Sequence, residues 1–323
     1  MHDVRRKERI LVATELTEAS TAPIAFAKTL AKPLNADLEL VHVTDMTGYE
    51  PVWEGADSRV KPHVEQLQAR LRARLDRAAE RLESARKDCE QAEMNATSAL
   101  LEGRPWQAIL EHATLHEFDM VMVGTHEAPP LDERIAAVRS RILGTTADRL
   151  VRHVSSPVWV VPPTKVVPPA KELPPHFRFL VAVDFSEASL DAVAVARSLA
   201  ERVQGSLVLT HVTVAAGDES DAEDPQGWQK ALQDSSHLLA NQELASLQKE
   251  IGGVQTRIHV RAARKRVDQE LLDAAEEEEA TVLVLGSEGR SANQNHGTLG
   301  GRILGSTVER LLRTTSMPVL VVR

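Results

Sequence analysis

Residues 141–152 read RILGTTADRLVR, and residues 302–313 read RILGSTVERLLR. Eight of the twelve positions are identical, and the second copy follows the first at an offset of 161 residues. A proline and four apolar residues follow each copy, as PVWVV at 157–161 and as PVLVV at 318–322. A repeat of this period indicates one domain that occurs twice, rather than a single domain of 323 residues.

Composition narrows the class of protein. The length suits two domains that each bury their own core. The net charge of −9 disfavours binding to nucleic acid, which needs Lys and Arg against phosphates. The single cysteine, Cys89, excludes an intramolecular disulfide and fits a reducing compartment. No signal peptide or apolar run of about 18 residues is found, so we expect a soluble cytoplasmic protein without a membrane partner.

Strands and helices alternate in the same order in both repeats. Continuous apolar runs are typical of strands in a parallel sheet that is covered on both faces. We expect strands at 10–14, 37–43, 96–101, 120–124 and 158–161, and again at 179–183, 206–212, 255–260, 281–285 and 319–322. Helices are expected at 17–31, 62–93, 106–115 and 145–153, and at 189–203, 228–251, 267–278 and 307–314. This order predicts two doubly wound parallel α/β domains.

The predicted domains are residues 1–162 and 177–323. Six prolines between positions 162 and 175 indicate a semi-rigid linker, residues 163–176.

Candidate binding residues follow the strands of the second repeat, because such sheets bind ligands beyond the carboxyl ends of their strands. Asp184 follows the first strand, where a carboxylate suits a ribose hydroxyl. Gly286-Ser287-Glu288-Gly289-Arg290 follows the fourth strand, and Gly305-Ser306-Thr307 opens the last helix. Glycines allow close approach of a phosphate, and the free amides of a helix N-terminus attract anions. These parts together describe a site for an adenosine phosphate.

These residues resemble the universal stress protein family in its tandem form, over nearly the whole chain outside the linker. The family signature is Gly-x2-Gly-x9-Gly-[Ser/Thr], with an Asp at the end of the first strand. The resemblance implies the adenine nucleotide alpha-hydrolase-like fold, ATP as ligand, and a valine, here Val212, against the adenine. It also implies that residues 158–161 pair with 319–322 inside one chain, as an intramolecular pseudo-dimer. The candidate binding residues are Asp184, Val212, Gly286, Ser287, Gly289, Arg290, Gly305, Ser306 and Thr307.

The two repeats depart from this signature to different degrees. In the second, fifteen residues separate Gly289 from Gly305, and the longer loop includes Asn293, Asn295, His296 and Gly297. In the first, Glu15 replaces the Asp and Glu127 stands at the second glycine, and sixteen residues separate Glu127 from Gly144. A carboxylate there repels a phosphate, so we expect the nucleotide in the second repeat and a structural role for the first.

Purely structural roles compete with these interpretations. Gly144 and Gly305 are also typical turn residues before a helix, and Asp184 can start a helical turn with Ser186. His112 and His116 are spaced as metal ligands, but no third ligand accompanies them, so we expect no metal site. His42 and His211 occupy equivalent positions, which favours a shared packing role over a pH sensor.

The sequence favours binding over turnover. The chain contains no P-loop lysine, so Arg290, Arg302 or Mg²⁺ would neutralise the phosphates, and no obvious base positions a water molecule. We expect a regulatory nucleotide that changes a surface offered to a protein partner, whose identity the sequence does not reveal. A slow ATPase and a scaffold that binds no nucleotide are the alternatives.

Overall fold

The computed structural model describes residues 7–17, 20–45, 61–127, 141–163, 176–214, 228–289 and 304–323. The first repeat contains strands β1 (Arg9–Ala13), β2 (Asp37–Thr44), β3 (Ala96–Glu102), β4 (Met120–Gly124) and β7 (Val158–Val161), and helices α1 (Thr21–Leu34), α2 (Lys61–Gln91), α3 (Pro105–Leu115) and α4 (Thr145–His153). The second contains strands β8 (Arg178–Ala182), β9 (Ser206–Thr213), β10 (Gln255–Ala262), β11 (Val282–Gly286) and β12 (Val319–Val322), and helices α5 (Glu187–Val203), α6 (Trp228–Ile251), α7 (Val267–Glu277) and α8 (Ser306–Thr314). The expected doubly wound α/β order is confirmed in both repeats.

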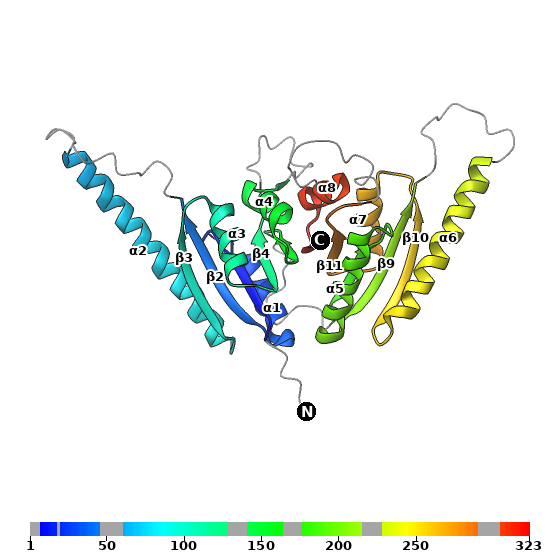
Figure 1. The fold of residues 1–323 in the computed structure, drawn as a ribbon, viewed down its shortest axis with the longest axis horizontal. Helices are drawn as coiled ribbons and strands as arrows, with labels where there is room; N and C mark the ends of the chain where they lie inside the picture. The colour runs from blue at the N-terminus through cyan, green and yellow to red at the C-terminus, as the bar shows by residue number, and fades with distance from the viewer. Residues whose placement is uncertain are drawn as a thin grey trace.

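The strands of both repeats form one sheet of ten strands, ordered β10-β9-β8-β11-β12-β7-β4-β1-β2-β3. Neighbouring strands are parallel within each repeat, and β7 and β12 are antiparallel where the repeats meet, with Trp159 opposite Leu320. The strand pairing implied by the family resemblance is therefore present. Helices α2 and α6 lie at opposite ends of the molecule, beside the outer strands (Figure 1).

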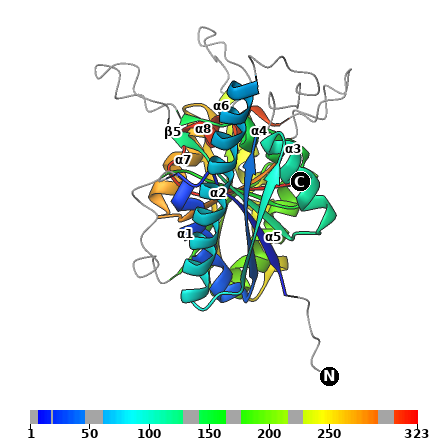
Figure 2. The same ribbon diagram turned by 90° about the vertical axis from the view of Figure 1, so that its left-hand side faces the viewer.

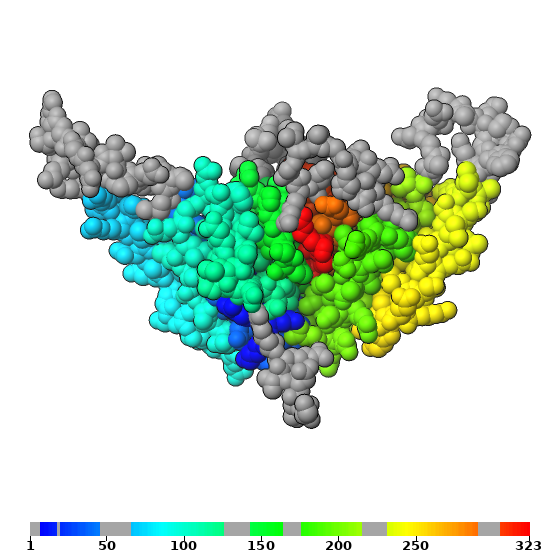
Figure 3. All heavy atoms as spheres, viewed as in Figure 1, coloured from blue at the N-terminus to red at the C-terminus, as the bar shows by residue number. Residues whose placement is uncertain are grey.

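Each face of the sheet has one hydrophobic core that runs through both repeats. One face packs against α1, α2, α5 and α6, and Phe26 of α1 meets Trp159 of β7 there, with ring centroids 5.1 Å apart. The other face packs against α3, α4, α7 and α8. Seen from the side, α2 runs along the edge of the sheet (Figure 2). In the space-filling view the two repeats meet along the middle of the molecule (Figure 3).

One local feature was not expected from the sequence. In the first repeat, β5 (His126–Glu127) pairs with β6 (Arg141–Ile142) as a short antiparallel ribbon. The sequence predicts only an altered glycine loop in this segment. Two-residue strands carry no periodic signal, so pattern reading does not detect them. Among the described helices, none combines the length and the apolar character that crossing a bilayer requires.

Candidate functional site

A cavity of about 500 Å³ lies in the second repeat, beyond the carboxyl ends of β8, β9 and β11. Helices α7 and α8 supply the rest of its wall. Seven of the predicted binding residues line it: Asp184, Val212, Gly286, Gly289, Gly305, Ser306 and Thr307. The structure therefore brings together residues from four separate segments of the chain.

The two other predicted residues are not part of the described cavity wall. Ser287 is buried and is not among the residues that line the cavity. Its amide donates to the carbonyl of Val322 at 2.7 Å, and its carbonyl accepts from the amide of Gly305 at 2.9 Å. Ser287 thus ties the loop after β11 to β12 and to the start of α8. Arg290 lies outside the described residues, as does Arg302.

Asp184 has a structural role in addition to its place in the cavity. Its Oδ1 accepts from the amide of Ser186 at 3.0 Å and from the Ser186 hydroxyl at 2.5 Å. Ser186 caps α5 by accepting from the amide of Ser189, and its hydroxyl also lies 3.3 Å from the carbonyl of Glu288. The turn that starts α5 is thus held against the loop after β11. Asp184 is both the start of a helical turn and a wall of the cavity.

The three glycines of the signature are not equivalent. A Cβ on Gly286 would lie 2.6 Å from the carbonyl carbon of Ala188 and 2.7 Å from the amide of Ser189, so helix α5 requires a glycine there. A Cβ on Gly289 would lie 2.8 Å from Oδ2 of Asp184. On Gly305 it would meet nothing closer than 3.5 Å. Close packing of α5 is therefore a sufficient reason for Gly286, whatever the ligand.

Helix α8 directs its N-terminus at the cavity. Gly305 precedes it, with φ −58°, and no side chain in the described part of the chain caps it. The first amides of a helix carry partial positive charge and have no partner inside the helix. With the hydroxyls of Ser306 and Thr307 beside them, these amides suit an anionic ligand.

The cavity wall also has an apolar part, which includes residues that the sequence did not single out. Val267 and Leu271 of α7 line it together with Val212 and Val214. His211 lines it as well, and its Nδ1 lies 2.6 Å from the carbonyl of Val183, to which it donates. The positions of Val267 and Leu271 depend on how α7 packs on the sheet, and no sequence motif specifies that packing. His211 had a usable signal, because it adjoins Val212 on the same strand.

The charge of the described cavity wall is negative. Asp184 and Glu288 line it, whereas no lysine or arginine does among the described residues. Carboxylates and hydroxyls are hard oxygen ligands of the kind that Mg²⁺ prefers. No cluster of three His, Cys, Asp or Glu residues suited to a metal occurs in the described parts of the chain. The wall therefore fits Mg²⁺ that arrives with phosphates, rather than a metal held by the protein alone.

The first repeat differs at the corresponding positions. Glu15 is exposed, and the hydroxyls of Thr14 and Ser20 organise the turn before α1, with Thr14 accepting from the amide of Leu16 at 3.1 Å. Glu127, at the position of Gly289, belongs to the β5–β6 ribbon. His42 repeats the bond of His211, with its Nδ1 2.8 Å from the Thr14 carbonyl. His42 and His211 thus share a packing role, while the loops near them differ between the repeats.

The His112–His116 pair has a local explanation. The two rings lie 4.4 Å apart, and Nε2 of His112 is 2.6 Å from a carboxylate oxygen of Glu39. Arg9 contacts the same carboxylate at 3.3 Å. These contacts join α3 to β1 and β2.

Comparison with known proteins agrees with the repeat. The sequence profile of the universal stress protein family matches residues 7–162 and again residues 176–323. A universal stress protein of Mycobacterium tuberculosis (strain ATCC 25618 / H37Rv) is 27% identical over 336 residues, which cover 100% of this chain and 99% of that protein. Another, from Mycolicibacterium smegmatis, is 30% identical over 206 residues, covering 63% of this chain and 61% of the relative.

A solved structure shares the complete arrangement. The crystal structure of a universal stress protein from Archaeoglobus fulgidus DSM 4304 matches with a TM-score of 0.62 and 20% identity, over 98% of each chain. At that identity the likeness concerns the fold. Both repeats match the family profile over most of their length, and the chain therefore belongs to the universal stress protein family and contains its domain twice.

Proposed function

We propose that the second repeat binds ATP or a related adenine nucleotide as a regulatory ligand. The observation that carries the proposal is the single cavity in which Asp184, Val212 and Gly289 meet the N-terminus of α8. The apolar side, with Val212 and Val267, suits a purine base. The amides at the start of α8 suit the phosphates. Asp184 follows β8, which lies between β9 and β11 in the sheet, so a ribose hydroxyl there would donate to its carboxylate.

Mg²⁺ is part of this proposal. Asp184 and Glu288 would repel an uncompensated polyphosphate, and the described wall contributes no lysine or arginine to offset that repulsion. When bound, Mg²⁺ would neutralise the phosphate charge. Removing Mg²⁺ with a chelator is therefore expected to weaken ATP binding by at least about tenfold, or roughly 1.4 kcal/mol.

The proposal favours binding over hydrolysis. Two groups that could act as a base are engaged in structural hydrogen bonds, Asp184 with Ser186 and His211 with the Val183 carbonyl. The bound nucleotide would act as a signal that a protein partner reads, because it would lie against both the α5 turn and α8.

Isothermal titration with Mg²⁺ and ATP tests the proposal. The intact chain should bind one equivalent. Gly289→Glu, which copies the first repeat at Glu127, should abolish binding because a carboxylate would then occupy the wall beside Asp184. Asp184→Ala should also weaken it. Glu15→Ala, at the exposed equivalent position of the first repeat, is the matched control and should bind like the parent protein.

Two outcomes would count against this assignment. No heat at concentrations that detect micromolar affinity would leave the scaffold alternative, and unchanged binding by Gly289→Glu would move the ligand elsewhere. Steady phosphate release that Asp184→Ala abolishes would instead identify a slow ATPase.

A further inference from the structure

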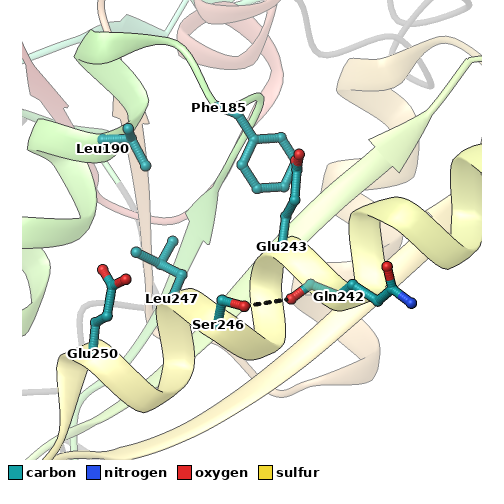
Figure 4. Close-up of a pocket in the computed structure, with 7 residues that line it drawn as sticks. All are labelled: Phe185, Leu190, Gln242, Glu243, Ser246, Leu247 and Glu250. Carbon is teal, nitrogen blue, oxygen red and sulfur yellow. Dashed lines mark hydrogen bonds between the residues drawn. The ribbon is translucent and has the colours of Figure 1, made fainter.

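A groove separate from the nucleotide cavity lies between α5 and α6. It encloses about 370 Å³ and is lined by Phe185, Leu190, Gln242, Glu243, Ser246, Leu247 and Glu250. In Figure 4, Leu190 and Phe185 form one side and the α6 residues the other. The groove is amphipathic, with leucine and phenylalanine side chains between two carboxylates.

The polar side of the groove is acidic. Glu243 and Glu250 are exposed and lie seven residues apart, on one face of α6. Neither carboxylate forms an ion pair with any residue in the described ranges. No basic residue lines the groove there. Two exposed carboxylates that form no ion pair within the described ranges favour a partner that carries positive charge.

An apolar stripe continues from the groove along α6. Leu232 and Leu239 are 57% and 58% exposed. With Ser246 they are spaced at seven-residue intervals, so they share the face that carries Glu243 and Glu250. Leu190 adds a further exposed leucine on α5. Exposed leucines grouped beside a groove mark an interaction surface better than leucines scattered singly.

The equivalent helix of the first repeat, α2, has one face that carries the opposite charge. Arg70, Arg74 and Arg77 of α2 are exposed and share one face, at spacings of four and three residues. None of the three forms an ion pair with the described part of the chain. Further along the helix the pattern changes, since Arg86 pairs with both Glu83 and Glu90. Arg81, one turn after Arg77, donates to the carbonyl of Leu16 at 3.4 Å. The arginine face therefore consists of Arg70, Arg74 and Arg77, at the end of α2 that precedes residue 78.

The two charged faces are opposite in sign and equal in the spacing of their charges. A helix rises about 1.5 Å per residue, so Arg70 and Arg77 are separated by about 10.5 Å along α2, as Glu243 and Glu250 are along α6. On each helix the charged face adjoins the buried one, marked by Leu82 on α2 and Leu244 on α6. We propose that the arginine face of α2 from a second copy of this chain docks in the α5–α6 groove.

This contact would join unlike surfaces. Helices α2 and α6 lie at opposite ends of the molecule (Figure 1), so each copy presents an arginine face at one end and an acidic groove at the other. Such a head-to-tail contact leaves both ends of a pair available and produces chains or rings of copies. The contact is independent of the nucleotide proposal.

Sedimentation velocity at low salt, over a range of protein concentrations, tests the contact. The intact chain should associate as its concentration rises and dissociate as salt screens the ion pairs. Glu243→Lys with Glu250→Lys should give monomers, and so should Arg70→Glu with Arg77→Glu. All four positions are exposed, so both variants should fold, which circular dichroism checks.

Mixing the two variants is the decisive step. Each groove then meets an α2 face of opposite charge on the other variant, so the mixture should associate again in a 1:1 ratio. Glu111→Lys with Glu201→Lys changes the net charge as the groove variant does, at exposed positions away from the groove, and should associate like the parent. A chain that stays monomeric at about 200 µM, or association that survives either charge reversal, would overturn the proposal.

Discussion

At the scale of single residues, the glycines of the signature separate packing from ligand binding. Gly286 has no room for a side chain because the backbone of α5 lies against it, whereas Gly305 has ordinary van der Waals space. Both occur in a motif that is read as phosphate-binding. The structure shows that Gly286 is required for packing against α5, whereas a side chain at Gly305 can be accommodated.

Alanine substitutions at these glycines should have different effects on stability. Gly286→Ala places a Cβ within 2.7 Å of the α5 backbone and should lower the free energy of unfolding. Overpacking of this kind typically costs about 1–3 kcal/mol. Gly305→Ala is the matched control, with its nearest contact at 3.5 Å, and should change stability by less than about 1 kcal/mol. Urea denaturation measures both, and equal effects would contradict the distinction.

At the scale of elements, the connection from β10 to α7 depends on one buried carboxylate. Glu270 is only 3% exposed, and its Oε1 accepts from the amides of Arg264 and Lys265 at 2.9 and 3.0 Å. Arg261 contacts its other oxygen at 3.1 Å. The amide of Arg264 is the main cause that lowers the pKa of Glu270, while burial opposes it. This carboxylate fixes the loop beside the α7 wall of the cavity.

The pKa of Glu270 predicts a pH dependence of stability. Because the folded pKa is lowered, the stabilisation is present above the unfolded value of about 4.3 and is lost as pH falls through the folded pKa. Glu270→Gln should cost about 1–3 kcal/mol at pH 7, because glutamine has one acceptor oxygen and cannot accept from both the two amides and Nε of Arg261. The difference in the free energy of unfolding between the variant and the parent protein should become smaller below about pH 4. Urea unfolding at several pH values measures it.

Glu277→Gln is the control for this prediction. Glu277 bonds the same arginine, Arg261, but is 56% exposed. Its substitution should therefore cost less than that of Glu270 at pH 7. A larger cost for Glu277, or a difference for Glu270 that is constant with pH, would contradict the role given to the buried carboxylate.

The elements were largely predictable from the sequence, and the site only in part. Long apolar runs and amphipathic segments fixed every strand of the large sheet and every helix to within a few residues. The β5–β6 ribbon was not predictable, because two residues carry no period. The motifs located the side of the cavity near Asp184 and Gly305. The part of the wall formed by Val267 and Leu271 depends on the packing of α7, which no local pattern specifies.

At the scale of the whole molecule, the β7–β12 pairing joins the two repeats in one continuous sheet. Leu320 and Trp159 are both fully buried and lie opposite each other across the repeat boundary. Both belong to the same core, which continues into α1 and α5. Loss of packing at this boundary should therefore be felt in both repeats.

Leu320→Ala should lower the stability of the two repeats together. A buried leucine truncated to alanine costs about 2–5 kcal/mol. Hydrogen exchange should show reduced protection in β1 and β4 as well as in β8 and β11, because the sheet is continuous. Leu115→Ala, at a residue that is 77% exposed, is the control and should change neither repeat. Reduced protection in the second repeat alone would show that the halves unfold independently.

The antiparallel boundary also has a genetic consequence. In a homodimer built from one gene, every substitution appears in both subunits, so a change that disables one binding site disables its twin. Here β7 and β12 are encoded separately, and either half can change without altering the other. Glu127 could replace a glycine in one half while Gly289 persists in the other. Because the two repeats are parts of one chain, their binding sites need not be identical, as they must be in a dimer of identical chains.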